Sequence, residues 1–111
     1  MQYIIYNSGG MFYIILHKGG MGMSAIVRRA VAGTLESSDA FVEIEPCSSG
    51  IQLELESVVE AQFGESIRAS VREVLDAQGI DSAKLHITDR GALDCVIRAR
   101  VETAVVRGRE A

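Results

Sequence analysis

The sequence predicts an α+β protein, a two-layer sandwich in which helices pack on one face of a small β-sheet. This fold class follows from strand segments that alternate strictly between apolar and polar residues, and from two amphipathic helical segments interleaved with them. In residues 41–45 (FVEIE) and 51–56 (IQLELE), apolar side chains alternate with acidic or amide side chains. Each segment therefore has one face for a core and one acidic face for solvent.

These two strand segments are expected to pair as a hairpin across the turn at residues 46–50. Residues 57–78 predict a helix that begins with a capping box (SVVE, 57–60) and ends at Gly79. Apolar residues recur along this helix at spacings of three and four, which is typical of a core-facing stripe. That stripe consists of Phe63, Ile67, Val71, Val74 and Leu75.

Residues 84–88 (KLHIT) predict a third strand, with His86 on its polar face. We interpret His86 as a surface histidine, because no acid or nucleophile in the sequence is obviously paired with it. A last helix is expected to begin near Ala92. Its predicted apolar stripe comprises Leu93, Val96, Ile97, Val101, Ala104 and Val105. The predicted order is β-β-α-β-α, and periodicity does not decide whether residues 24–32 form a helix or a strand.

Residues 1–22 differ from the rest of the chain and are treated as an N-terminal extension. Two apolar runs, each too short to span a membrane, flank NSGG at 7–10, which favours a hairpin. A second interpretation is that the extension is a translated leader. Lys18-Gly19-Gly20 can be encoded by a run that resembles a bacterial ribosome-binding site, which would make Met21 or Met23 the natural start. No function is assigned to this segment.

Composition excludes several classes of function. The net charge of -4 and the pI near 5.1 argue against nucleic-acid binding, and the absence of Trp argues against a base-stacking platform. Two cysteines without a CxxC motif and two histidines do not predict a metal site. The simpler interpretation of Cys47 and Cys95 is two free thiols in a reducing cytoplasm, although a disulfide stays open. Without a phosphate-binding loop or a nucleophile-base motif, a self-sufficient enzyme is not expected.

The stretch GTLESSD (33–39) interrupts the regular pattern with small, polar and acidic residues. Gly33 can adopt positive φ, and Ser37, Ser38 and Asp39 are residue types that favour turns and helix caps. The plain interpretation is a turn. The functional interpretation is a loop that presents a serine for covalent modification.

Three blocks carry a resemblance to a known family: GTLESSD (33–39), VVEAQFG (58–64) and DRGALDCV (89–96). In this order they resemble the acyl carrier protein, or gamma subunit, of citrate lyase, over roughly residues 30–107. The resemblance implies that residues 23–111 form an acyl carrier domain. It also implies that the serine after Leu-Glu, Ser37, carries a phosphoribosyl-dephospho-coenzyme A arm through a phosphodiester. Many members have Gly where this chain has Ser38, so a second hydroxyl lies beside the proposed acceptor, and Ser38 is the second candidate.

The resemblance further implies a role and partners for the chain. The arm would hold acetyl and citryl thioesters while the alpha and beta subunits convert citrate to acetate and oxaloacetate, so the chain would be a non-catalytic subunit. A separate prosthetic-group transferase would activate Ser37. Glu36 and Asp39 are expected to repel the incoming phosphate, so the transferase would supply compensating cations. Neither a nucleic acid nor a membrane is an expected partner, and the expected compartment is the cytoplasm.

Two alternatives remain at this point. The related carrier subunit of malonate decarboxylase uses a similar arm, although the GTLES and GALDC blocks favour citrate lyase. The chain would otherwise be an unmodified interaction module, whose acidic sheet face docks a basic partner.

Overall fold

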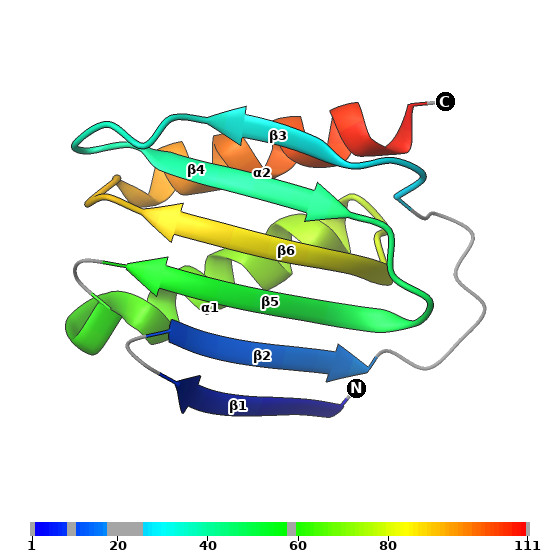
Figure 1. The fold of residues 1–111 in the computed structure, drawn as a ribbon, viewed down its shortest axis with the longest axis horizontal. Coiled ribbons are helices and arrows are strands. Elements are labelled where there is room, and N and C mark those ends of the chain that lie inside the picture. Colours follow the sequence, from blue (N-terminus) through cyan, green and yellow to red (C-terminus); the bar gives the residue numbers. More distant parts are fainter. Residues whose placement is uncertain (1, 9–10, 18–25, 58–59, 111) are drawn as a thin grey trace.

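The computed structural model describes residues 2–8, 11–17, 26–57 and 60–110 of the 111-residue chain. These residues form six strands and two helices. In chain order they are β1 (Gln2–Ser8), β2 (Met11–His17), β3 (Ala30–Gly33), β4 (Ala40–Glu45), β5 (Gly50–Ser57), α1 (Glu60–Ala77), β6 (Ser82–Asp89) and α2 (Asp94–Arg109). The strands make one sheet in the order β1-β2-β5-β6-β4-β3, with both helices on one face (Figure 1). The predicted fold class is confirmed.

The core lies between the sheet and the helices. β6 is at its centre, parallel to β5 and antiparallel to β4, so that Leu85 is opposite both Leu53 and Ile44. All three side chains are almost completely buried. Helix α1 joins the parallel strands β5 and β6, which cannot be connected by a tight turn and need a crossover. The buried stripes of both helices close the other side of the core.

The predicted hairpin between residues 41–45 and 51–56 is wrong. β4 and β5 are consecutive in the chain, but β6 lies between them and pairs with both. The physical reason is that β6 alternates as strictly as its neighbours and buries Ala83, Leu85 and Ile87 against the apolar faces on either side. The predicted order also omitted β3, since residues 30–33 are a strand that pairs with β4 along one edge of the sheet.

Both helices are present as predicted, but α2 begins later than expected and leaves Leu93 outside the helix. α1 buries Ile67, Val71, Val74 and Leu75, while the side chain of Phe63 and most of the predicted capping box lie outside the described residues. α2 begins at Asp94, two residues later than predicted near Ala92. Leu93 has an extended backbone (φ -68°, ψ 155°) and is 71% exposed, so its predicted place on the buried stripe is wrong.

Part of the N-terminal extension joins the same sheet. β1 and β2 pair antiparallel, as expected for a hairpin, and β2 pairs antiparallel with β5. β1 is therefore one edge of the sheet and β3 is the other. That these residues are a translated leader stays a prediction.

Candidate functional site

The loop that carries Ser37 joins β3 to β4, and two backbone conformations define its ends. Gly33 has φ +90°, and a Cβ at this position would lie 1.8 Å from the carbonyl oxygen of Ala40. Only glycine fits such a close approach between two strands. Ser38 has φ 67°, and among the described residues it is the one non-glycine residue with positive φ. Side chains from Thr34 to Ser38 are exposed.

Hydrogen bonds within the loop give it a fixed shape. The Thr34 hydroxyl donates to Asp39 Oδ2 (2.7 Å) and accepts a hydrogen bond from the Glu36 amide (3.2 Å). The Asp39 amide donates to the Glu36 carbonyl (3.2 Å). Ser37 lies at the tip, and within the described part of the chain its hydroxyl has neither a hydrogen-bond partner nor a covering side chain. The loop therefore presents an accessible hydroxyl on an ordered support.

Asp39 anchors the loop to helix α2. Arg100 Nε donates to Asp39 Oδ1 and Arg100 Nη2 to Asp39 Oδ2, both at 3.0 Å. Hydrogen bonds from Arg100, and then from Thr34, lower the pKa of Asp39 from its usual 3.8 to about 2. Asp39 is therefore a paired carboxylate. The expectation that Asp39 repels an incoming phosphate is wrong, because the Arg100 guanidinium neutralises it; Glu36 is the acid that remains exposed.

The segment between β6 and α2 anchors the other side of the loop. The Ser38 amide donates to the Arg90 carbonyl, and the Arg90 amide donates to the Asp39 carbonyl, both at 2.9 Å. The preceding residue, Asp89, is 1% exposed and fixes the turn, because its Oδ1 accepts from the amides of Gly91 (3.1 Å) and Ala92 (2.8 Å). The first and third of the blocks that carry the family resemblance, GTLESSD and DRGALDCV, thus lie side by side in space at one end of the sheet (Figure 1).

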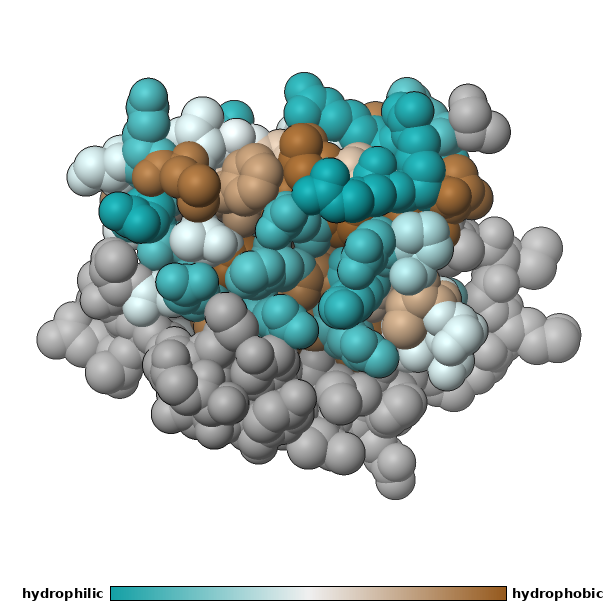
Figure 2. All heavy atoms as spheres, in the orientation of Figure 1, coloured by the Kyte–Doolittle hydropathy of each residue, from teal (hydrophilic) through white to brown (hydrophobic). Residues whose placement is uncertain are grey.

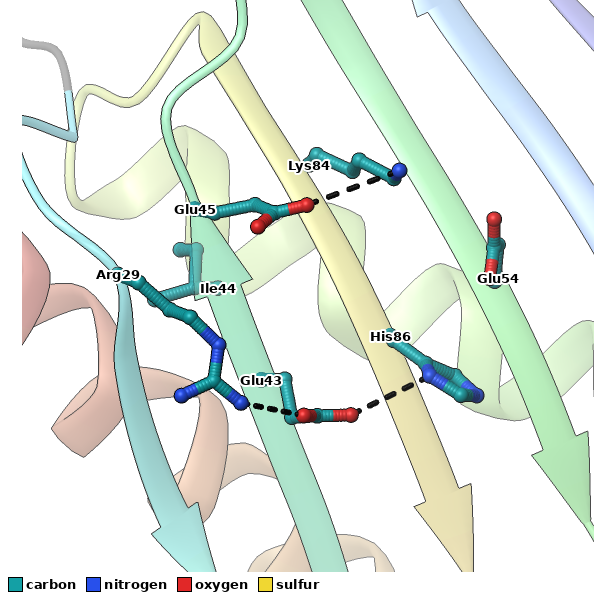
Figure 3. A pocket seen from close by; sticks show the side chains of 7 residues that line it. All are labelled: Arg29, Glu43, Ile44, Glu45, Glu54, Lys84 and His86. Carbon is teal, nitrogen blue, oxygen red and sulfur yellow. Dashed lines mark hydrogen bonds and ion pairs between the residues drawn. The ribbon is translucent and has the colours of Figure 1, made fainter.

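The open face of the sheet is the second candidate site. Figure 2 shows hydrophilic side chains spread over the part of this face that is drawn in colour. A hollow of about 200 Å³ here is lined by Arg29, Glu43, Ile44, Glu45, Glu54, Lys84 and His86 (Figure 3). This face is less acidic than predicted, because β6 places two cationic or basic side chains between the glutamates of β4 and β5. Lys84 Nζ lies 3.6 Å from Glu45 Oε1.

His86 has an acid partner on this face, contrary to the prediction. Its Nδ1 lies 3.3 Å from Glu43 Oε2, and Arg29 Nη2 contacts the other oxygen of Glu43 at 2.6 Å. No sequence pattern indicates this contact, because residues 43 and 86 become neighbours only through the β4–β6 register. The lining residues include no serine, threonine or cysteine nucleophile for an imidazole base to activate. The group is best described as a surface ion-pair network.

Other classes of site are not seen in the described residues. They contain no group of three or more His, Cys, Asp and Glu side chains placed to hold a metal ion. Cys47 and Cys95 are both unpaired. Neither α1 nor α2 combines the length and the hydrophobicity that crossing a bilayer requires.

Comparison with known proteins gives matches over most of the chain. The family described as malonate decarboxylase delta subunit (MdcD), an acyl carrier family, matches residues 27–108. The citrate lyase acyl carrier protein of Escherichia fergusonii is 54% identical over 77% of this chain and 89% of its own. Citrate lyase acyl carrier protein 2 of Salmonella typhimurium is 50% identical over the same shares. The Haemophilus influenzae citrate lyase acyl carrier protein is 52% identical over 77% of this chain and 88% of its own.

A solved structure supports the fold. A chain in the crystal structure of a Pseudomonas malonate decarboxylase hetero-tetramer in complex with malonate matches with a TM-score of 0.73 and 21% identity. The match covers 87% of this chain and 96% of that one. The matches to the curated relatives define the class of the protein as an acyl carrier protein. Within this class, the chain belongs to the family of the citrate lyase acyl carrier proteins.

Proposed function

We propose that the chain is the acyl carrier subunit of a citrate lyase and that Ser37 is the attachment point of its prosthetic arm. The observation that carries the site assignment is the exposed, unpartnered hydroxyl of Ser37 at the tip of a loop held on both sides, by Arg100 and by the Arg90 backbone. Identity of 50–54% to citrate lyase acyl carrier proteins favours citrate lyase over malonate decarboxylase.

The support for Ser37 over Ser38 is geometric. The Ser38 amide is held by the Arg90 carbonyl, and its backbone is in the left-handed region (φ 67°). Within the described part of the chain, neither the amide nor the hydroxyl of Ser37 makes a hydrogen bond that would constrain it. A transferase that takes the serine into its own active site needs room around the acceptor, which the tip of the loop provides.

The proposed arm is phosphoribosyl-dephospho-coenzyme A, joined through a phosphodiester. Attachment would form a bond between Ser37 Oγ and phosphorus, release the leaving group of an activated donor, and pass the hydroxyl proton to a base of the transferase. When bound, the arm supplies a terminal thiol that carries acyl groups as thioesters. The chain's own contribution is to hold the acceptor serine outward and to keep the arm tethered, which raises the effective concentration of the thioester at partner sites.

The proposed partners are the alpha and beta subunits of citrate lyase, which would carry out the chemistry, and the prosthetic-group transferase. The carrier itself is proposed to be non-catalytic. His86 with Glu43 is on the open face of the sheet, whereas the Ser37 loop is at one end of the sheet, so the His86 imidazole is not placed to activate the serine.

Mass spectrometry of the protein purified from a host with active lyase tests this proposal. The expected result is a Ser37 peptide that carries the mass of the arm. The matched variants are Ser37→Ala and Ser38→Ala, both exposed serines of the same loop. Ser37→Ala should fold normally and abolish both modification and lyase activity, while Ser38→Ala should retain both. Modification retained in Ser37→Ala would move the site to Ser38, and an unmodified wild-type chain in cells with active lyase would overturn the carrier function.

A further inference from the structure

We propose that the carrier has a docking site for the nucleotide part of its own arm, in which Arg90 pairs with phosphate and an adjacent apolar hollow takes the adenine ring. The inference rests on the proposed function. It names a non-covalent site beyond the attachment serine, formed by the segment that follows β6 and by the facing surfaces of α1 and α2.

Arg90 is the first component of the site. Two backbone hydrogen bonds of 2.9 Å fix it beside Ser38 and Asp39, and its side chain is exposed. Within the described part of the chain its guanidinium has no carboxylate partner, whereas Arg100 is paired with both carboxylate oxygens of Asp39. Arg90 is thus the cation next to the attachment loop that remains available for an anion. A planar guanidinium with several donors suits a phosphate group.

The apolar hollow is the second component, and it begins one residue after Arg90. It measures about 280 Å³ and is lined by Ser66, Ile67, Gly91, Ala92, Leu93, Asp94 and Ile97. Its one acidic group is engaged elsewhere, because the Asp94 carboxylate accepts hydrogen bonds from Ser70 and from Arg98 Nε (2.8 Å). Cavities for drug-sized ligands measure ~300–1,000 Å³, so this one suits a single ring rather than a whole cofactor.

Exposed apolar side chains support the choice of this end of the molecule. The described residues include four large hydrophobic side chains that are exposed, and two of them are on the paired segments, Leu35 (55%) in the serine loop and Leu93 (71%) before α2. Leu93 lines the hollow and lies outside the buried stripe that sequence periodicity predicts for it. An exposed leucine and an exposed arginine three residues apart in one segment offer an apolar surface and a cation, the two chemistries that a nucleotide needs.

Covalent attachment at Ser37 is the reason to propose the arm's own nucleotide as the ligand of this site. An arm on Ser37 starts within the same hydrogen-bonded pair of segments as Arg90, so its phosphate and its nucleoside are always close to this site. Intramolecular binding then requires little intrinsic affinity, since the effective concentration is high. Docking of the nucleotide would leave the remaining, thiol-bearing portion of the arm free to reach partner subunits.

Nuclear magnetic resonance of the modified carrier, with methyl-labelled Ile and Leu, tests the proposal. The expected result is nuclear Overhauser contacts from the adenine protons to the methyl groups of Leu93 and Ile67, and a shifted Arg90 Nε–H resonance. The unmodified Ser37→Ala chain should show neither. Arg90→Gln and Leu93→Ser should each remove the contacts while mass spectrometry still finds the arm on Ser37. Their matched controls are Arg72→Gln and Val106→Ser, two exposed side chains on α1 and α2 that do not line the hollow.

The outcomes separate the two proposals. An arm present on Ser37 by mass, with narrow adenine resonances and no contact to either methyl group, would overturn the docking site and leave the proposed function intact. Contacts that persist in both Arg90→Gln and Leu93→Ser would also overturn it. Absence of any arm on the native protein would overturn both.

Discussion

Arg100 and Asp39 are 61 residues apart in the sequence, and they meet as a two-pronged pair with both nitrogen-oxygen distances at 3.0 Å. The pair joins the middle of the last helix to the end of the serine loop. Asp39 also accepts from Thr34 and from its neighbour's amide, Ala40 N (2.7 Å), so that both carboxylate oxygens are saturated. The loop geometry therefore depends on α2 as much as on the two strands that it connects.

We expect this pair to stabilise the fold measurably. Asp39→Asn should lower the free energy of unfolding by about 1–3 kcal/mol, because it removes a charge-assisted acceptor from a partly buried network. A double-mutant cycle with Arg100→Gln, measured by urea denaturation, should give a coupling energy of ~1–2 kcal/mol. The control cycle is Arg29 with Glu43, a more exposed pair with one contact of 2.6 Å, for which less than ~1 kcal/mol is expected. Equal coupling in the two cycles would contradict a special role for Asp39.

Stability should fall in acid through the same carboxyl group. The pKa of Asp39 is about 2 in the folded chain and 3.8 in its usual state, so the unfolded chain takes up the proton first. Its stabilisation is complete above about pH 4 and is lost as the pH falls through about 2, an effect of about 1–2 kcal/mol. Ser70 and Arg98 also lower the pKa of Asp94, which adds a loss in the same direction. Denaturation curves of the wild type and Asp39→Asn should converge in this window; a constant difference across it would refute the assignment.

Gly33→Ala should be one of the most disruptive changes in the described part of the chain. The added Cβ would lie 1.8 Å from the Ala40 carbonyl oxygen, a backbone atom that cannot move aside without opening the β3–β4 pair. A loss of at least about 2 kcal/mol is expected from strain at positive φ and overpacking together. Thermal unfolding would measure it. Gly79→Ala, at φ 70° after the end of α1, provides the comparison for the cost of positive φ at a helix end.

Ser38→Gly should have the opposite effect. Ser38 is held at φ 67°, where a side chain costs energy and glycine does not, so the substitution should raise stability by up to about 1 kcal/mol. The modification of Ser37 should be unaffected, because the Ser38 amide keeps its hydrogen bond to Arg90. A destabilised Ser38→Gly chain would show that the serine side chain makes a contribution that its backbone geometry does not predict. The preference for glycine at this position, implied by the family resemblance, has the same physical basis.

Local sequence patterns predict where most strands and helices lie, but they do not predict which strands pair with one another. The alternation at residues 41–45, 51–56 and 84–88 predicts three strands and which side chains are buried in them. It cannot tell that β6 pairs with both of the others, because an inserted central strand and a simple hairpin bury the same residues. Leu93 fits a helical stripe by spacing, yet the Asp89 side chain holds a turn there and delays the helix to Asp94.

In the candidate site, too, local sequence indicates the position of interest but not its tertiary contacts. The loop motif alone favours a plain turn, and the three-block family resemblance is what singles out Ser37 as the proposed acceptor. The residues that shape the loop come from elsewhere in the chain. Arg100 is one of several arginines in α2, and only its position opposite the loop distinguishes it from Arg98, which binds Asp94 and Glu73 instead. Arg90 is adjacent in sequence to the buried Asp89, and its relation to Ser38 is a consequence of backbone pairing. Such contacts follow from the tertiary fold and leave no periodic trace.

The anchoring of the loop to late residues has a consequence for biosynthesis. A nascent chain exposes Ser37 long before Arg90 and Arg100 have been translated, so the loop cannot take its final shape until the C-terminal helix has emerged and packed. The final conformation of the acceptor loop is therefore present only in a chain whose whole domain has been synthesised and folded. A transferase that recognises this conformation, rather than the linear motif around Ser37, would modify only fully folded carriers.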